Sequence, residues 1–154
     1  MLYLWLKYIH IVSSTILFGT GLGTACVMWY GHYKKDVHAM AIINEYVVLV
    51  DWIFTGTSGI VQPVTGLWMV FIAGYSFTSL WVLGSIIGYL IAAACWIPVV
   101  FLQIKIRNLT VYAARSGLTL PQEYFFYFRW WFLLGWPAFI SLLIVFYLMV
   151  MKPF

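Results

Sequence analysis

The chain has 154 residues, of which 65% are hydrophobic and 8% charged, and its eight Lys and Arg residues outnumber the four Asp and Glu. A soluble domain contains about 25% charged residues, so this composition excludes one and is typical of a polytopic protein in contact with the lipid bilayer. The basic excess does not indicate nucleic-acid binding, because cations at the ends of membrane spans account for it.

Four apolar segments predict four transmembrane helices. We place the spans at about residues 3–29, 46–73, 80–104 and 130–151. Residues 52–104 contain no Asp, Glu, Lys or Arg, and as one helix they would extend about 80 Å against a hydrocarbon core of about 30 Å, so they must form two spans. The apolar residues run continuously, which argues against a barrel. The sequence therefore predicts an all-α four-transmembrane-helix bundle, a single membrane domain over residues 1–154.

The cations predict the orientation of this bundle. Six of the eight follow the first and third spans: Lys34, Lys35, Lys105, Arg107, Arg115 and Arg129. Cytoplasmic links are enriched in Lys and Arg. We therefore expect a multi-pass protein of a bacterial inner (cytoplasmic) membrane, with both basic links inside and both termini outside.

His10 is the most informative polar residue of the first span. Lys7, His10, Ser14 and Gly21 lie on one stripe of a 3.6-residue helix, so this face should look into the bundle. An imidazole in hydrocarbon is costly unless it is bonded, which makes His10 a candidate metal or haem ligand or a proton relay. The alternative is a structural histidine that is hydrogen-bonded to a neighbouring hydroxyl or carbonyl.

The depth of His10 limits its partners. It lies about 10 Å below the outer end of its span, level with residues 62–69 of the antiparallel second span. Within one chain the opposite haem ligand would be Met69, Lys7, a water or nothing, and a bis-histidine haem would need a second subunit. The other two histidines are expected on a solvated loop at the opposite membrane face: His32 and His38.

Two residues of the second span interrupt its apolar character. Asp51 lies a little more than one turn inside the span on the cytoplasmic side, where it either serves a proton path or pairs with Arg107 or Arg129. Pro63 lacks an N–H and deprives the Gly59 carbonyl of its helical partner, so we expect a kink with free carbonyls near mid-membrane.

Small residues predict close helix packing. Gly84, Gly88 and Ala92 recur every four residues along the third span, and Gly19 and Gly23 do so in the first. This spacing indicates contacts within the bundle or between the subunits of a dimer.

The link between the third and fourth spans contains helix signals. Lys105 to Arg115 can continue the third helix, and Ser116-Gly117 should end it. Thr119 and Gln122 have the spacing of a capping box, which predicts a fourth helix with Thr119 at its N-cap.

Several segments carry a family resemblance. They are LWLKYIHI at 4–11, LFGTG at 17–21, DW at 51–52, QPVTG at 62–66 and WIPV at 96–99. Over nearly the whole chain they resemble an uncharacterised family of small bacterial four-helix integral membrane proteins.

The first helix is similar, more distantly, to the oxygen-independent protoporphyrinogen oxidase family and to the copper-resistance membrane domain. In the oxidase family a first-helix histidine is associated with haem binding and activity, which implies haem binding at His10. That family opens its third helix with a segment that bears His and Lys, whereas residues 80–85 here read LWVLGS. The resemblance therefore favours haem binding over protoporphyrinogen oxidation.

These observations predict a protein that binds haem b or a porphyrin through His10, with a redox or haem-handling role. The alternative is a non-catalytic subunit or assembly factor of a larger, respiratory-type membrane complex, and a third reading is a small transporter that uses Asp51 and the break at Pro63. The partner would be a second copy or a larger complex. No hydrolase or nucleotide-binding motif occurs, and no catalytic residue is indicated.

Overall fold

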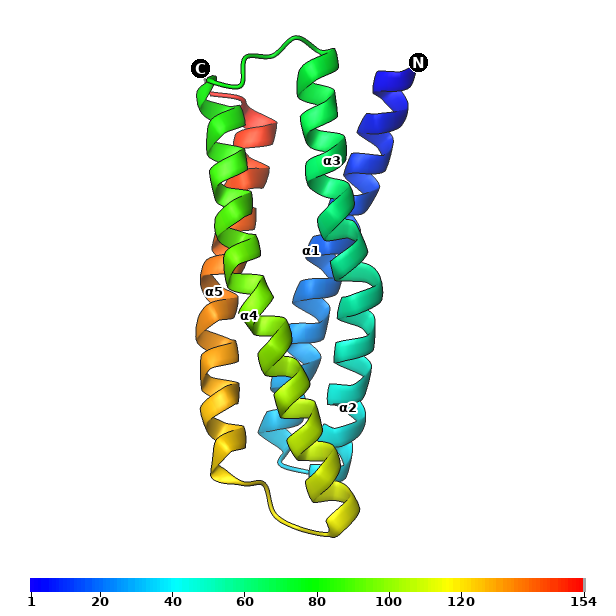
Figure 1. The fold of residues 1–154 in the computed structure, drawn as a ribbon, viewed down its shortest axis with the longest axis vertical. Helices are drawn as coiled ribbons and strands as arrows, with labels where there is room; N and C mark the ends of the chain where they lie inside the picture. The colour runs from blue at the N-terminus through cyan, green and yellow to red at the C-terminus, as the bar shows by residue number, and fades with distance from the viewer. Residues whose placement is uncertain (154) are drawn as a thin grey trace.

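The structure, a computed structural model of the chain, describes residues 1–153, and its regular elements in that range are all helices. They are α1 (Leu2–Lys34), α2 (Val37–Val50), the π-helix η1 (Asp51–Gly56), α3 (Thr57–Ile72), α4 (Leu80–Ser116) and α5 (Gln122–Met151). Because α2, η1 and α3 continue into one another, the chain forms four long rods (Figure 1). Each rod is long and apolar enough to cross a membrane, which confirms the predicted four-helix membrane bundle.

The two ends of the bundle differ in what they carry. Both termini and the turn at residues 73–79 lie at one end, here called the terminal end (Figure 1). The links at residues 35–36 and 117–121 lie at the other, the basic end. The helices extend past the predicted spans at the basic end, so five of the six cations expected in the links lie on α1, α4 and α5, and only Lys35 lies in a link.

Local sequence explains three of the helix boundaries at the basic end. Lys35 ends α1 in the left-handed conformation, and the Asp36 carboxylate caps α2 by accepting hydrogen bonds from the backbone N–H groups of His38 and Ala39 at 3.0 and 3.2 Å. Gly117 ends α4 with a φ of 63°, which glycine adopts without strain. The predicted break at Ser116-Gly117 is thus confirmed.

The predicted capping box at Thr119 is wrong. Helix α5 begins at Gln122, and Pro121 before it is extended with a ψ of 162°. An extended proline cannot belong to a helical turn that starts at Thr119, and Leu120, which precedes a proline, is itself disfavoured from helical geometry.

The apolar core lies in the half of the bundle nearest the basic end. All four rods contribute to it: Met28, Met40, Val47, Val99, Ile106, Tyr124, Phe128 and Trp131. Lipid tails are as apolar as these side chains, so close packing and dispersion hold this core together in a bilayer.

Helices α4 and α5 approach each other through the small residues of α4. A Cβ built on Gly84 would lie 2.8 Å from Leu148 Cδ1, and one built on Gly88 would lie 2.8 Å from Val145 Cγ2. A side chain at either position would require the neighbouring residue of α5 to shift. The small-residue stripe of the third span is therefore a contact within the bundle.

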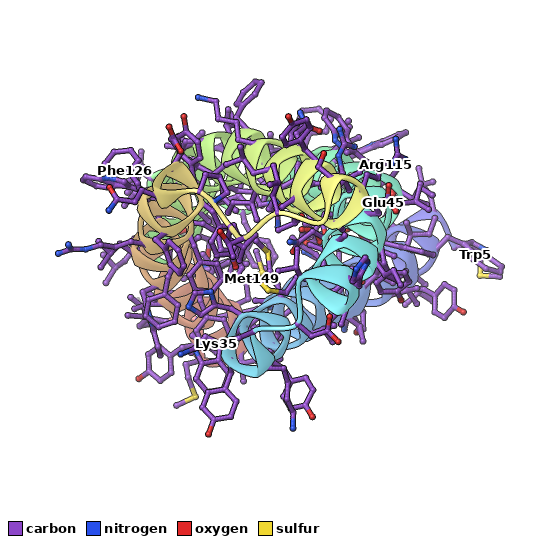
Figure 2. The ribbon with its side chains drawn as sticks, turned by 90° about the horizontal axis from the view of Figure 1, so that it is seen from below. Trp5, Lys35, Glu45, Arg115, Phe126 and Met149 are labelled. Carbon is purple, nitrogen blue, oxygen red and sulfur yellow. The ribbon has the colours of Figure 1, made fainter. Side chains whose placement is uncertain are left out.

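The glycines of α1 lie on a different kind of surface. A Cβ on Gly19 or Gly23 would meet nothing within 4 Å in the described chain. Figure 2 looks along the bundle from the basic end, with Met149 toward the middle and Trp5 and Phe126 pointing outward. Gly19 and Gly23 are exposed, unlike Gly31 of the same helix, which packs against Ile43.

Candidate functional site

A stripe of buried polar residues runs along the rod formed by η1 and α3. Its members follow each other at intervals of three or four residues, and each is at most 8% exposed: Asp51, Thr55, Ser58, Gln62 and Thr65. This spacing places them on one helix face, over about 20 Å of helix length. Facing residues of α1 are buried as well: His10, Ser13 and Thr24. We call this set of eight residues the polar seam.

His10 lies against three residues of the QPVTG segment of α3. Its Nδ1 is 2.8 Å from the Thr65 hydroxyl, and Gln62 Nε2 donates to the His10 backbone carbonyl at 2.7 Å. A Cβ on Gly66 would lie 3.1 Å from His10 Cε1, so the absence of a side chain there makes room for the ring. The predicted level of His10 relative to the second span is confirmed.

The Thr65 hydroxyl determines which ring nitrogen of His10 is free. Thr65 Oγ1 lies 2.7 Å from the Val61 carbonyl and donates its single proton to it. It therefore accepts a hydrogen bond from His10 Nδ1–H, and we assign the lone pair to Nε2 on the basis of this network. No hydrogen-bond partner of Nε2 occurs among residues 1–153. The Nε2 atom is the one that can bind a metal or accept a proton.

The other predicted ligands are placed differently. Lys7 is exposed on α1, and Ser14 and Gly21 of the predicted polar stripe are only half-buried. Met69 is half-buried on α3, about one turn nearer the terminal end than Gly66. Of the three predicted haem ligands, His10 alone is held in place by the neighbouring helix.

His32 is not the loop residue that the sequence indicates. It belongs to α1, stacks on Phe128 with a ring-centroid distance of 3.8 Å, and lies with Nδ1 2.9 Å from the Tyr124 hydroxyl. The reason is that α1 continues as a helix to Lys34, which brings His32 against α5. His38 is exposed.

Asp51 is buried to 4% exposure among neutral hydrogen-bond donors. Thr24 and Thr55 donate to Oδ1 at 3.0 Å each, and Gln103 Nε2 donates to Oδ2 at 2.7 Å. These donors come from α1, η1 and α4, so Asp51 joins three of the four rods. Nothing in the sequence singles out Gln103 for this role.

Neither arginine that the sequence offers to Asp51 bonds to it. The Arg107 guanidinium donates instead to the Asn108 side chain at 2.9 and 3.2 Å, and Arg129 is exposed. Both lie nearer the basic end than Asp51, where their charges stay close to water. The ion pair expected as one alternative is replaced by neutral hydrogen bonds.

The carbonyl that Pro63 releases is not left free. Tyr89 of α4 donates its hydroxyl proton to the Gly59 carbonyl oxygen. Pro63 thus creates an acceptor on α3 that α4 uses, and the prediction of an unpaired carbonyl is corrected.

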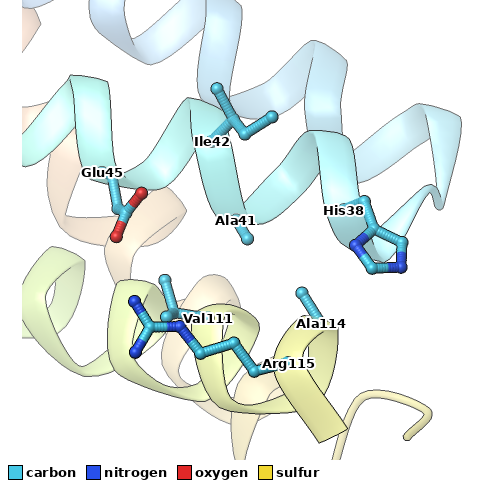
Figure 3. Close-up of a pocket in the computed structure, with 7 residues that line it drawn as sticks. All are labelled: His38, Ala41, Ile42, Glu45, Val111, Ala114 and Arg115. Atoms are coloured by element: carbon cyan, nitrogen blue, oxygen red, sulfur yellow. The ribbon is translucent and has the colours of Figure 1, made fainter. Parts of the chain in front are cut away.

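A groove opens between α2 and α4 at the basic end (Figure 3). It has a volume of about 380 Å³ and is lined by His38, Ala41, Ile42, Glu45, Val111, Ala114 and Arg115. Its floor is apolar, and its rim holds one acid and one guanidinium, so it has no strong preference for either sign of charge.

The side chains of the described residues do not by themselves form a metal-binding site. No group of three or more His, Cys, Asp or Glu that could hold a metal ion occurs in the described part of the chain. Cys26 and Cys95 are free thiols. A haem iron is a separate case, because its porphyrin supplies four nitrogens and the protein needs to add only one or two axial ligands.

Comparison of the sequence with known proteins identifies one matching family. A family model described as a predicted integral membrane protein (DUF2269) matches residues 4–153. No curated protein and no solved structure matches the chain.

Proposed function

The chain belongs to the DUF2269 family of predicted integral membrane proteins, and from that premise we propose that it binds a b-type haem or another porphyrin, with His10 Nε2 as the axial ligand. Its role is then redox or haem-handling. The observation that carries the proposal is the contact between His10 Nδ1 and the Thr65 hydroxyl, whose bond to the Val61 carbonyl assigns the proton to Nδ1 and the lone pair to Nε2. Histidines that bind metals almost always have their other ring nitrogen bonded in this way.

The surroundings of His10 support the same reading. Gln62 holds the backbone of His10, Thr65 holds the ring, and the lack of a side chain at Gly66 leaves room for the ring at Cε1 and Nδ1. Bound there, a haem would supply one-electron chemistry in an environment with little water. The residues themselves bind, orient the ring and exclude solvent. Met69 or Lys7 of the same chain, or His10 of a second copy, would supply the opposite ligand.

The test is the visible spectrum of protein purified with an adequate haem supply. We expect a Soret band in the wild type, and its loss or a strong shift in His10→Ala. His38→Ala is the matched control, because His38 is exposed and outside the seam, and His32→Ala should also keep the band. Thr65→Val should weaken haem affinity about 10- to 100-fold, as removal of such supporting partners typically does, whereas Thr65→Ser should retain it.

A colourless wild-type protein after haem supplementation would contradict haem binding, and a Soret band that is unchanged in His10→Ala would contradict ligation by His10. A change of spectrum in Met69→Leu would identify that thioether as the opposite ligand. No change would exclude it.

The second candidate function is a non-catalytic subunit or assembly factor of a larger membrane complex. The observation that favours it is the exposed α1 face around Gly19 and Gly23. A Cβ built on either glycine would have no other described helix within 4 Å. Small residues on membrane helices allow another helix to approach closely. A protein without haem, by the test above, would leave this function as the better supported one.

A further inference from the structure

Asp51 has a feature that haem binding at His10 does not use. It is a buried acid near the middle of the bundle, and its three hydrogen-bond donors are neutral. A carboxylate without a cationic partner is costly to keep inside a bilayer. Binding of a cation would remove this cost, and the smallest cation is a proton.

Gln103 can serve Asp51 in both protonation states. Its amide Nε2 now donates to Asp51 Oδ2, while its amide oxygen, Oε1, is buried and has no hydrogen-bond partner in the described chain. If the amide turns by 180°, Oε1 takes the place of Nε2 and can accept an O–H from a protonated Asp51. The Gln103 amide can therefore pair with Asp51 in its charged form and in its neutral form.

Thr24 has the same capacity to change partners. Its hydroxyl lies 3.0 Å from Asp51 Oδ1 and also 2.9 Å from the Thr20 carbonyl, but it has only one proton to donate. When Asp51 is charged the hydroxyl can donate to the carboxylate, and when Asp51 is neutral it can turn to the carbonyl. Neither state leaves the Thr24 hydroxyl proton unpaired.

We propose that Asp51 is a reversible proton-binding site, with Gln103 as the partner of both its charged and its neutral form. A hydronium ion donates one proton to the carboxylate: one of its O–H bonds breaks, one carboxyl O–H bond forms, and a water molecule is released. Both carboxylate oxygens already hold close partners. A proton fits this compact site without displacing any side chain, whereas a sodium ion would need five or six oxygens around it.

The site does not extend into a continuous proton wire along the seam. Between Asp51 and His10, the hydroxyls of Ser13 and Ser58 donate to backbone carbonyls and not to one another. The proposal is therefore confined to proton binding at Asp51 and is independent of haem at His10.

The charged and titratable groups on the packed elements have other surroundings; Lys105, two residues beyond Gln103 on α4, lies with its amine 4.9 Å from the centroid of the Tyr127 ring. Toward the basic end they are His32 on α1, Glu45 on α2, Lys105 and Arg107 on α4, and Tyr124 and Arg129 on α5. Toward the terminal end they are His10 on α1 and Tyr89 on α4. None of them forms a hydrogen bond with Asp51 in the described chain, so the titration should belong to one carboxyl group.

Infrared spectroscopy of the full chain across a pH series tests the proposal directly. The other three acids, Asp36, Glu45 and Glu123, are exposed. We expect a carboxylic-acid C=O band from a buried group that disappears reversibly as the pH is raised. The band should be lost in Asp51→Asn and kept in the matched control Glu45→Gln. It should shift in Gln103→Leu, because the acid loses its partner.

A second measurement covers the case in which Asp51→Asn fails to fold. Aspartate labelled with ¹³C in the wild-type protein should move the band, since the only other aspartate, Asp36, is exposed. Absence of a titrating band from a buried acid would overturn the proposal, and so would a band that the label leaves in place. A carboxylate signal that responds to replacement of sodium by choline, and not to pH, would identify sodium as the ion and would equally overturn it.

Discussion

At the scale of single residues, the position of His10 depends on what α3 places beside it. Thr65 and Gln62 provide hydrogen bonds to its ring and backbone, and Gly66 provides space. Hydrogen bonds between membrane helices contribute about 0.6 kcal/mol on average and up to about 1.7 kcal/mol. Their main effect here is thus orientation of the ring, and stabilisation of the bundle is secondary.

The space beside His10 can be tested with two alanine substitutions on the same helix. In Gly66→Ala the new Cβ would be 3.1 Å from His10 Cε1, and the ring cannot retreat without stretching its bond to Thr65. In Gly59→Ala the nearest contact, the Tyr89 hydroxyl at 3.7 Å, is an ordinary one. We expect Gly66→Ala to be about 1 kcal/mol less stable than Gly59→Ala.

Equilibrium unfolding of both variants in the same detergent measures the difference in their free energies of unfolding. The comparison is matched, because each variant gains the same helix propensity from replacement of glycine by alanine. Equal stability of the two proteins would show that the His10 ring has room to move.

At the scale of elements, the rod of η1 and α3 combines two departures from regular α-helix. The π-helix at residues 51–56 adds an extra residue to the turn at Asp51, and Pro63 removes one backbone hydrogen bond. Both departures give rise to contacts with α4, through Gln103 and through Tyr89. The second rod is therefore attached to α4 by polar groups at the places where its own helix is irregular.

A double-mutant cycle tests the link between Pro63 and Tyr89. Tyr89→Phe should destabilise the wild type by about 1 kcal/mol, because the Gly59 carbonyl loses its donor. In a Pro63→Ala background the restored backbone N–H of residue 63 can bond to that carbonyl, so the same substitution should cost clearly less. Unfolding free energies of the four proteins give the coupling. Additive effects would mean that Tyr89 does not replace the bond that Pro63 removes.

At the scale of the whole molecule, the two ends of the bundle are chemically distinct. The basic end holds the links at residues 35–36 and 117–121 and the cations of these links and the flanking helices, and the terminal end holds the uncharged turn at residues 74–79 (Figure 1). Positive residues mark the cytoplasmic side of membrane proteins. We propose that the basic end faces the cytoplasm of a bacterial cell and that both termini lie outside.

Reporter fusions test this orientation. A reporter that is active only outside the cytoplasm should work when it is fused after the C-terminus or inserted at residues 74–79. It should fail within residues 34–35 or at Gly117, because six of the eight cations follow the first and third spans. Activity of the Gly117 fusion would reverse the topology.

The sequence by itself determined the class of protein and the number of spans, because a stretch of 53 residues without charge has few solutions in water or in lipid. It also determined features that depend on one helix alone, such as the end of α4 at Gly117 and the carbonyl released by Pro63. The level of His10 against residues 62–69 followed from helical rise in antiparallel spans.

The tertiary structure decided which side chains meet. Helical periodicity defines the faces of each span, but the rotation of one helix against its neighbour depends on packing along the whole contact. For this reason the partners of Asp51 are Gln103 and two threonines and not an arginine, and His32 packs against Phe128. For the same reason the glycine stripe of α4 contacts α5, whereas the glycine stripe of α1 lies on the outer surface. The polar seam exists only because α1 and α3 turn their buried polar faces toward each other.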